Sequence, residues 1–305
     1  MPVGPTSSNL NRLDLKTLRL FAAICEEGTL NGTARRAAIA PSAVSKRLAE
    51  LERLFGCELL TRDPKGMRPT LAGETLLHHT RRMLASAEQI TLELAEHARG
   101  VRGFVRVLAN LSAIVQFLPE DLQAFLAVQA DIRVDLEERP SSSVVAGVEE
   151  GAADLGICAG NTDTRSLRPI PYRRDRLVLV LPAEHPLAGR DAVALADTLD
   201  FDHVGLHQES SIYGTLRDEA RRLGRPLRLR IHVPGFDAIC RMAQAGMGLG
   251  VVPERIHALL GPQMNLTAVR LSDPWAQRTL NLVVRHGALA PAASLLLDHL
   301  HETFR

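Results

Sequence analysis

The side chains best suited to chemistry near the start of the chain are hydroxyls and amines on a helix that we expect to begin at Pro41. Pro41 fits the first turn of a helix, where its missing N–H costs nothing. One face of this helix is apolar and comprises Val44, Leu48, Leu51 and Phe55. The opposite face carries Ser42, Ser45, Lys46 and Arg47. Because hydroxyls and amines bond to base edges and phosphates, the pattern predicts a helix that reads the major groove of DNA.

Two shorter helices must position this reading helix. The first is predicted to stop near Gly28, and its apolar face comprises Leu15, Leu18, Phe21, Ala22 and Cys25. The second is predicted from Thr29 to Ala38, with Thr29 as its N-cap and an inner side formed by Leu30, Ala34 and Ala37. A short connection through residues 39–40 then leads to Pro41. The sequence therefore predicts a helix-turn-helix.

Residues 57–70 read as two short strands joined by the turn Asp63-Pro64-Lys65-Gly66. Cations along them are placed to contact the phosphate backbone. The candidate contacts to double-stranded DNA are Thr29, Arg35, Pro41, Ser42, Ser45, Lys46, Arg62, Lys65 and Arg68. The alternative is a small helical domain whose exposed cations, such as Arg19 and Arg53, are merely solvated.

Residues 28–74 resemble the DNA-binding domain of LysR-type transcriptional regulators. The matching positions are Ala34, Ala43-Val44-Ser45, Leu51-Glu52, Arg62, Arg68 and Thr70-Leu71-Ala72-Gly73-Glu74. One departure is Ala40-Pro41, where the family usually has Ser-Gln, so a usual N-cap and a usual base-reading amide are absent. The resemblance extends over nearly the whole chain and implies a winged helix-turn-helix in residues 12–70.

A proline-free helical pattern covers residues 71–100. Its heptad-like stripe comprises Leu77, Leu84, Thr91 and Ala98, with Ala87 and Leu94 between them and Met83 and Ile90 beside them. A helix of about 28 residues spans roughly 42 Å, which is too long to bury its stripe in one small domain. We expect an identical partner helix, although a long core helix of a large domain is the alternative. The resemblance implies a linker helix that forms a homodimer, followed by a hinge that ends at Gly103, so this segment spans 71–103.

From Phe104 onward predicted strands and helices alternate, which indicates βαβ units and a parallel sheet. The predicted strands are 105–109, 132–136, 155–157, 177–181, 203–206, 227–233, 249–252 and 279–285, and the helices are 112–128, 143–150, 211–223, 236–245 and 291–303. Two α/β halves joined by two crossing segments would enclose a cleft, as in periplasmic solute-binding proteins. Three motifs also resemble LysR-type effector domains, namely residues 151–157, 185–188 and 245–253.

The predicted fold class is thus an N-terminal all-α winged helix-turn-helix with a long linker helix, followed by a C-terminal α/β effector domain of two Rossmann-like subdomains. The effector domain would cover residues 104–305, with subdomain I at about 104–173 and 279–305 and subdomain II at about 174–278. We expect dimers to pair further into a homotetramer through these domains, with the heads on an interrupted inverted repeat in a promoter.

Polar residues between strands and helices mark the predicted cleft. Hydroxyls beside free backbone N–H groups and a positive helix end suit a carboxylate or another small anion. The candidate effector-binding residues are Asn110, Ser112, Ser141, Ser142, His207, Ser210 and Ser211. For each serine the plain alternative is an N-cap. Arg139, Arg173 and Arg174 could supply a counter-charge, although ion-paired surface roles are the alternative.

Composition and absent motifs restrict the function further. The net charge of +1 divides into +4 for residues 1–103 and −3 for residues 104–305, so the positive excess lies in the expected DNA-binding head. Four scattered cysteines, no signal peptide and no apolar run of ~20 residues indicate a cytoplasmic protein with reduced thiols and no membrane span. No spacing suggests a metal, a cofactor or an enzyme motif. A solute-binding protein and an α/β enzyme with a helical appendage remain the alternative classes.

Overall fold

The computed structural model describes residues 13–63, 66–97 and 103–302. The chain divides into two compact units, Met1–Ala95 with Glu150–Ala152 and Glu96–Glu149 with Ala153–Arg305. Lys65 and most of the predicted hinge lie outside the described residues, as does the side chain of Arg62. None of the described helices combines the length and apolarity needed to span a bilayer.

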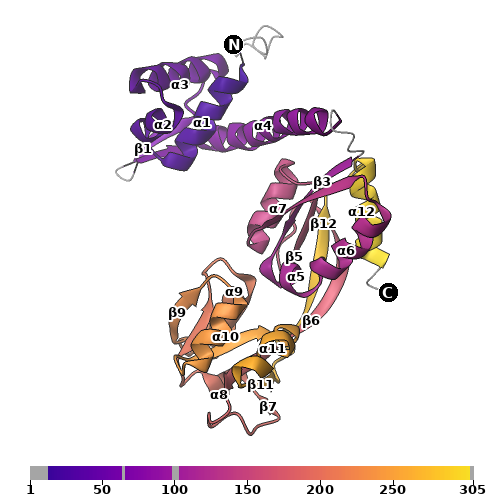
Figure 1. Ribbon diagram of the computed structural model, residues 1–305. Helices are drawn as coiled ribbons and strands as arrows, with labels where there is room; N and C mark the ends of the chain where they lie inside the picture. Colours follow the sequence, from indigo (N-terminus) through magenta and orange to yellow (C-terminus); the bar gives the residue numbers. More distant parts are fainter. Residues whose placement is uncertain (1–12, 64–65, 98–102, 303–305) are drawn as a thin grey trace. The chain divides into compact units, whose positions relative to one another are not determined.

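Three helices form the body of the first unit, namely α1 (Leu15–Glu27), α2 (Leu30–Ala37) and α3 (Pro41–Phe55) (Figure 1). Gly28 and Gly56 end α1 and α3 in the left-handed conformation, with φ of 65° and 68°. Thr29 caps α2, since its side chain accepts a hydrogen bond from the backbone N–H of Gly32. These boundaries confirm the helix-turn-helix expected from the pattern of apolar residues and caps.

The core of this unit is smaller than the apolar pattern suggests. Phe21, Ile24, Ala34, Val44 and Leu51 are buried in it. Three residues expected on inner faces are exposed instead, namely Leu15, Ala37 and Phe55. Each lies at or near the end of its helix, where the helix extends past the neighbours that cover its central turns.

The wing consists of β1 (Leu60–Asp63) and β2 (Gly66–Pro69), which pair antiparallel. It is attached to the helices by a short backbone hydrogen bond of 2.6 Å from the N–H of Met67 to the carbonyl of Gly28. Gly66 has a φ of 130°, and a Cβ there would lie 2.6 Å from the same carbonyl oxygen. Only glycine therefore allows the wing to approach the α1–α2 turn so closely.

The long helix α4 (Leu71–His97) follows directly from the wing. A Cβ at Gly73 would lie 2.0 Å from the carbonyl oxygen of Leu59, so α4 begins in backbone contact with the segment that leads into β1. Leu71, Met83 and Ile90 are 85%, 43% and 59% exposed. The helix thus presents apolar side chains that its own unit does not cover.

The second unit contains two halves that share a long strand, β6 (Arg168–Pro182) (Figure 1). In the first half the strand order is β4-β3-β5-β12-β6, with β3 (Gly103–Ala109), β4 (Ile132–Glu138), β5 (Leu155–Ala159) and β12 (Gln277–Val284). One face packs against α5 (Leu111–Gln116), α6 (Leu118–Val128) and α12 (Pro291–Glu302). The other face packs against α7 (Ser141–Glu150).

The second half surrounds the C-terminal part of β6, where all residues of 177–181 are buried. Its strands are β7 (Ala192–Val193), β8 (His203–Leu206), β9 (Leu229–Val233), β10 (Leu249–Pro253) and β11 (Leu266–Leu271). Its helices are α8 (Leu195–Thr198), α9 (Ser211–Arg222), α10 (Phe236–Gln244) and α11 (Glu254–Leu260). Short 3-10 turns, Pro262–Met264 and Pro274–Ala276, precede β11 and β12. This arrangement confirms a two-part α/β domain.

Several expected elements differ in detail. The predicted helix from Ser112 to Val128 is two helices, because Phe117 leaves the helical conformation and a new helix starts at Leu118 with Pro119 in its first turn. The helix expected at Ser143 begins at Ser141. The sheet is mixed, since β12 and β10 pair antiparallel with β6, whereas β3, β4 and β5 are parallel. The elements β7, α8, α11 and β11 were not expected.

Glu52 provides a test of how the wing is held. Its Oε1 accepts hydrogen bonds from the backbone N–H groups of Leu59 and Leu60, at 2.9 and 3.4 Å. Removing this acceptor in Glu52→Ala should lower the local opening free energy by about 1–3 kcal/mol. We expect hydrogen exchange of the peptide covering residues 58–63 to accelerate about tenfold or more. The exposed neighbour Glu50 serves as the control, and equal exchange in Glu50→Ala and Glu52→Ala would contradict this role.

Candidate DNA-binding and effector-binding sites

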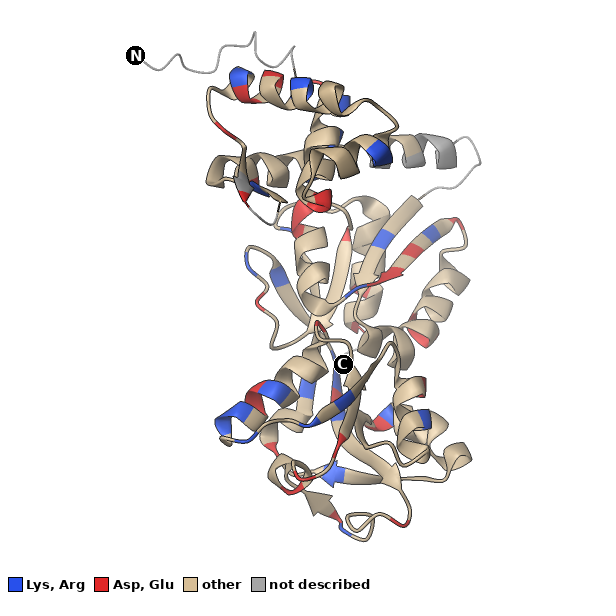
Figure 2. Ribbon diagram, turned by 90° about the vertical axis from the view of Figure 1, so that its left-hand side faces the viewer, with Lys and Arg blue, Asp and Glu red and all other residues tan. Residues whose placement is uncertain are grey.

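The face of α3 expected to read DNA is open to solvent. Ser42, Ser45 and Lys46 are all exposed. The helix starts with Pro41 at its first position, and Ala40 provides no side-chain cap. Figure 2 shows blue and red segments along α3, so its cations are interspersed with acids rather than forming one positive block. The helix therefore offers hydroxyl and amine donors on an unobstructed surface.

The remaining head residues have more varied surroundings. Thr29 is exposed but caps α2, and Arg35 is exposed on the same helix. Arg68 is 3.6 Å from Asp63 across the wing, in an exposed ion pair of little strength. Arg47 was expected to face outward, yet it donates to Thr17 Oγ1 at 2.8 Å and lies 3.7 Å from Asp14. Arg47 therefore joins α3 to the start of α1.

A polar pocket of about 500 Å³ lies in the second unit and is called the serine cleft below. Four of the predicted effector residues line it, namely Ser141, Ser142, Ser210 and Ser211. Asn161, Thr162 and Gln208 add amide and hydroxyl groups, and Trp275 adds an aromatic surface. The first turns of α7 and α9 both contribute to the wall. Asn110, Ser112 and His207 are not among the lining residues of the serine cleft.

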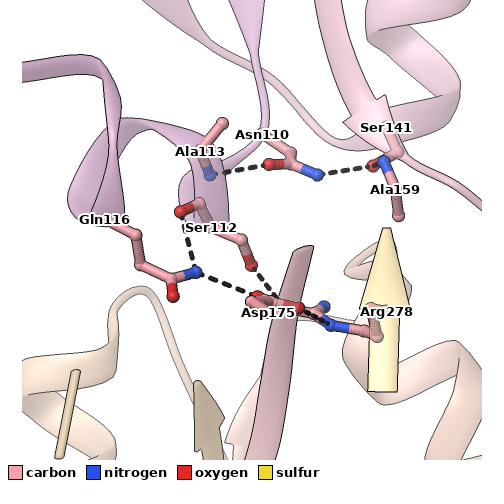
Figure 3. Close-up of polar contacts among 8 residues, drawn as sticks. All are labelled: Asn110, Ser112, Ala113, Gln116, Ser141, Ala159, Asp175 and Arg278. Carbon is pink, nitrogen blue, oxygen red and sulfur yellow. Dashed lines mark hydrogen bonds and ion pairs between the residues drawn. The ribbon is translucent and has the colours of Figure 1, made fainter. Parts of the chain in front are cut away.

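Ser141 is held rigidly by its neighbours (Figure 3). Its Oγ accepts hydrogen bonds from Asn110 Nδ2 and from the backbone N–H of Ala159, both at 3.1 Å. Asn110 is itself the N-cap of α5, because its Oδ1 accepts from the N–H of Ala113. A serine hydroxyl has two lone pairs and one proton, so Ser141 keeps only its O–H to donate. Asn110 thus positions Ser141 from behind the cleft wall.

The two halves of the unit meet across the serine cleft. Asn161 Nδ2, in the first half, donates to Thr215 Oγ1 of α9 at 3.3 Å. The wall formed by α9 and the loop before it contains Glu209, Asp218, Glu219 and Arg222, and Figure 2 shows both charge colours along α9. Arg222 is paired with Glu219 at 2.6 Å, and Arg217 and Arg221 are paired with Asp218 at 3.1 and 3.4 Å. The cleft therefore has a hydroxyl-rich side at α7 and a side of ion-paired charges at α9, to which Glu209 adds a carboxylate.

A buried network at the crossing strands contains Ser112 (Figure 3). Asp175 of β6 and Arg278 of β12 form an ion pair whose side chains are only 3% and 9% exposed. Arg278 Nη2 donates to Ser112 Oγ at 3.3 Å, and Gln116 Nε2 donates to Asp175 Oδ2 at 3.0 Å. The sequence did not predict this pair, since its partners are 103 residues apart. The only available signal was that opposite charges lie just before two expected strands, 177–181 and 279–285.

Two of the arginines expected to supply a counter-charge for the effector, Arg173 and Arg139, are paired with acidic side chains of the protein. Arg173 binds Asp121 at 2.7 Å, and Tyr172 donates to the same carboxylate at 2.5 Å. Burial, together with the hydrogen bond to Asp121, raises the pKa of Tyr172. Arg139 pairs with Glu137. For Arg139 and Arg173 the ion-paired alternative therefore holds.

The described residues include no group of histidine, cysteine and acidic side chains suited to a metal ion. Burial raises the pKa of Cys158 to about 12 and that of Cys240 to about 11, so both thiols stay protonated near neutral pH. Cys57, in contrast, is exposed.

The Asp175–Arg278 pair yields a stability prediction. Asp175→Asn would leave a buried guanidinium without its counter-charge, at a cost of about 3–5 kcal/mol. We expect the melting transition of the second unit to fall by roughly 6–20 °C, measured by calorimetry on the full chain. Asp135→Asn, an exposed position on β4, is the control and should leave the transition in place. A melting temperature for Asp175→Asn that matches the wild type would rule out this structural role.

Comparison with known proteins identifies both parts of the chain. The model "Bacterial regulatory helix-turn-helix protein, lysR family" matches residues 15–74, and the model "LysR substrate binding domain" matches residues 98–305. The transcriptional regulator CysL of Bacillus subtilis is 28% identical over 59% of this chain and 60% of its own length. The uncharacterized regulator YbhD of Escherichia coli is 24% identical over 92% of this chain and 88% of its own.

Solved structures show the same fold. The LysR family regulator CbnR has a TM-score of 0.67 at 20% identity, covering 96% of this chain and 100% of CbnR. CbnR in complex with its target DNA has a TM-score of 0.65 at 20% identity, over 95% of this chain and 100% of that chain. The effector-binding domain of QuiR in complex with shikimate has a TM-score of 0.59 at 20% identity, over 66% of this chain and 96% of that chain. With a DNA-binding head and an effector-binding domain both matched, the chain belongs to the LysR family of transcriptional regulators.

Proposed function

We propose that this regulator controls transcription in response to a small hydroxylated carboxylate bound in the serine cleft. The proposal rests on the hydrogen bonds of Ser141. Both lone pairs of its Oγ accept hydrogen bonds, and its O–H remains to donate. A group that accepts hydrogen bonds is the complementary ligand. The N-terminal end of α7 adds unpaired backbone N–H groups and a positive dipole at the same place.

The acids near α9 indicate which other groups the ligand carries. Glu209 and the ion-paired carboxylates of Asp218 and Glu219 can accept hydrogen bonds from hydroxyl groups, and Glu209 repels a second negative charge. We therefore propose one carboxylate at α7 and hydroxyl groups directed toward α9, with Trp275 against an apolar part of the ring or chain. The structural likeness to the QuiR domain, which was solved with the hydroxylated carboxylate shikimate, supports this class.

For the head, we propose that α3 lies in the major groove with Ser42, Ser45 and Lys46 toward the bases and phosphates. Thr29, Arg35, Arg62, Lys65 and Arg68 would contact the backbone on either side. Two copies would pair through α4, where Met83 and Ile90 are exposed, and two such dimers would form a tetramer on an interrupted inverted repeat. The likeness to CbnR bound to its target DNA supports this partner, and we propose that the protein acts on DNA in the cytoplasm.

The response would arise from closure of the two halves on the ligand. Within the described part of the chain, a long hydrogen bond from Asn161 to Thr215 crosses the serine cleft. A ligand that bonds to α7 and α9 together would add further links and favour one relative placement of the halves. A coupling of about 1–3 kcal/mol would change promoter affinity by roughly 5- to 150-fold.

The reading helix is tested with the double variant Ser45→Ala/Lys46→Ala. We expect promoter affinity to fall about tenfold or more, because a hydroxyl and a phosphate-binding amine are lost. The slope of log affinity against log salt concentration should also become less steep by about one per head. The measurement is a salt-dependent gel shift on promoter DNA.

The control is Arg53→Ala, which removes one charge from an exposed position near the other end of α3. It should change affinity by less than twofold, and chromatography with light scattering should show the same oligomer for all three proteins. Undiminished binding by the double variant would refute the assignment of α3 as the reading helix.

The serine cleft is tested with Ser142→Phe, which fills the pocket from an exposed position in the first turn of α7. A panel of hydroxylated carboxylates that includes shikimate is screened by thermal shift of the full chain. A ligand present at about 100 times its Kd should stabilise the wild type by about 2.7 kcal/mol. We expect this stabilisation to vanish in Ser142→Phe and to persist in Ser143→Phe, whose exposed side chain does not line the cleft. Equal stabilisation of both variants would show that the effector binds elsewhere.

A further inference from the structure

The second unit contains another pocket, of about 860 Å³, which shares no lining residue with the serine cleft. It is called the arginine pocket below. Its wall includes consecutive residues 174–176 of β6 and 277–279 of β12, together with the end of α5 and the start of α11. The arginine pocket is therefore built on the two strands that join the halves.

The side chains that line this pocket carry a net positive charge. Arg174, Arg176, Arg255 and Arg278 line it, against Asp175 and Glu254. Asp175 is already neutralised by Arg278, and Arg255 is 3.3 Å from the exposed Glu120. Among the described residues Arg176 has no ion-pair partner. A net positive, half-enclosed wall favours a ligand with several negative charges.

Two buried polar atoms of the lining lack partners among the described residues. Arg278 Nη1 and Gln116 Oε1 form no hydrogen bond there, although Arg278 Nη2 and Gln116 Nε2 both do. Figure 3 shows these two side chains converging on Asp175. An unsatisfied buried polar atom costs about 1–3 kcal/mol, more for a charged group. An anionic oxygen would satisfy the guanidinium, and a hydroxyl on the same ligand would satisfy the Gln116 oxygen.

From this geometry we propose that the arginine pocket is a second ligand site, which takes a small polyanion with at least two negative charges. Phosphate groups and clustered carboxylates share this chemistry, and Arg176 binds either as a planar donor pair. The site differs in ligand class from the serine cleft, where Glu209 disfavours a second negative charge. The proposal does not rest on the effector assigned to that cleft.

The two pockets are adjacent along the chain at one point. Pro274 lines the arginine pocket and Trp275 lines the serine cleft, within the turn that leads into β12. A polyanion that fixes this turn would also fix the position of Trp275. We therefore expect occupancy of the two pockets to be coupled, with reciprocal effects on the two affinities.

The test is isothermal titration of the full chain with pyrophosphate in one arm and citrate in the other, at constant ionic strength, with acetate as the monovalent comparison. We expect saturable binding of at least one polyanion at one site per chain, and no saturation with acetate. Arg176→Gln should weaken this binding tenfold or more. Arg168→Gln removes the same charge from an exposed position on β6 outside the pocket and should change it less than twofold.

The outcomes separate this site from others. Binding of pyrophosphate alone identifies phosphate groups as the source of charge, and binding of citrate alone identifies carboxylates. Unchanged binding in Arg176→Gln, or no saturation in either arm, overturns the proposal. Loss of polyanion binding in Ser142→Phe with retention in Arg176→Gln would place the ligand in the serine cleft and equally overturn it. Promoter binding without ligand should be unaffected by Arg176→Gln, which lies outside the head.

Discussion

The ion pair between Asp175 and Arg278 is the interaction on which the ligand-binding unit depends. Both side chains are almost completely removed from water, so each charge is tolerable only beside the other. The pair fixes β6 against β12 at the level where the two halves meet, and Gln116 and Ser112 extend it to α5. The junction between the two halves of the effector domain is consequently polar and has a specific geometry, and an apolar core lies on either side of it.

The same unit contains two pockets that differ in charge. In one, the Ser141 hydroxyl and the start of α7 lie opposite α9, whose charges are ion-paired. In the other, arginines from the crossing strands predominate. Other contacts in the described unit also join the halves, among them Asn161 with Thr215 and Arg255 with Glu120. Under the function proposed above, a ligand would select between placements of the halves through such contacts.

Local signals in the sequence were sufficient to predict the helices of the head and most helices and strands of the second unit. Gly28 and Gly56 end helices in a conformation that suits glycine, Thr29 is a helix cap, and Pro41 suits only the start of a helix, so each boundary was correctly predicted. Contacts between residues far apart in the sequence could not be predicted from such local signals. The Asp175–Arg278 pair, the role of Arg47 at Thr17 and the outward position of Phe55 depend on which segments pack together.

The candidate effector site was partly predictable because its serines lie at helix starts. A serine at the start of a helix is recognisable in the sequence, and four such residues line the serine cleft. Whether a given polar side chain faces the cleft or supports its wall is decided by neighbours from other strands, as Asn110 shows by binding Ser141 from behind. The break at Phe117, which turns Gln116 toward Asp175, likewise required the tertiary structure.

The contact between Gly73 and the carbonyl of Leu59 has a mechanical consequence for the head. Backbone touches backbone there, with no side chain between them to yield, and Thr70 bonds to both sides of the junction through its N–H and its hydroxyl. Helix α4 and the wing must therefore move together as one rigid body. In the dimer proposed above, a change in the angle between two α4 helices would change the spacing of the two wings along a duplex, because each α4 would act as a lever arm about 40 Å long.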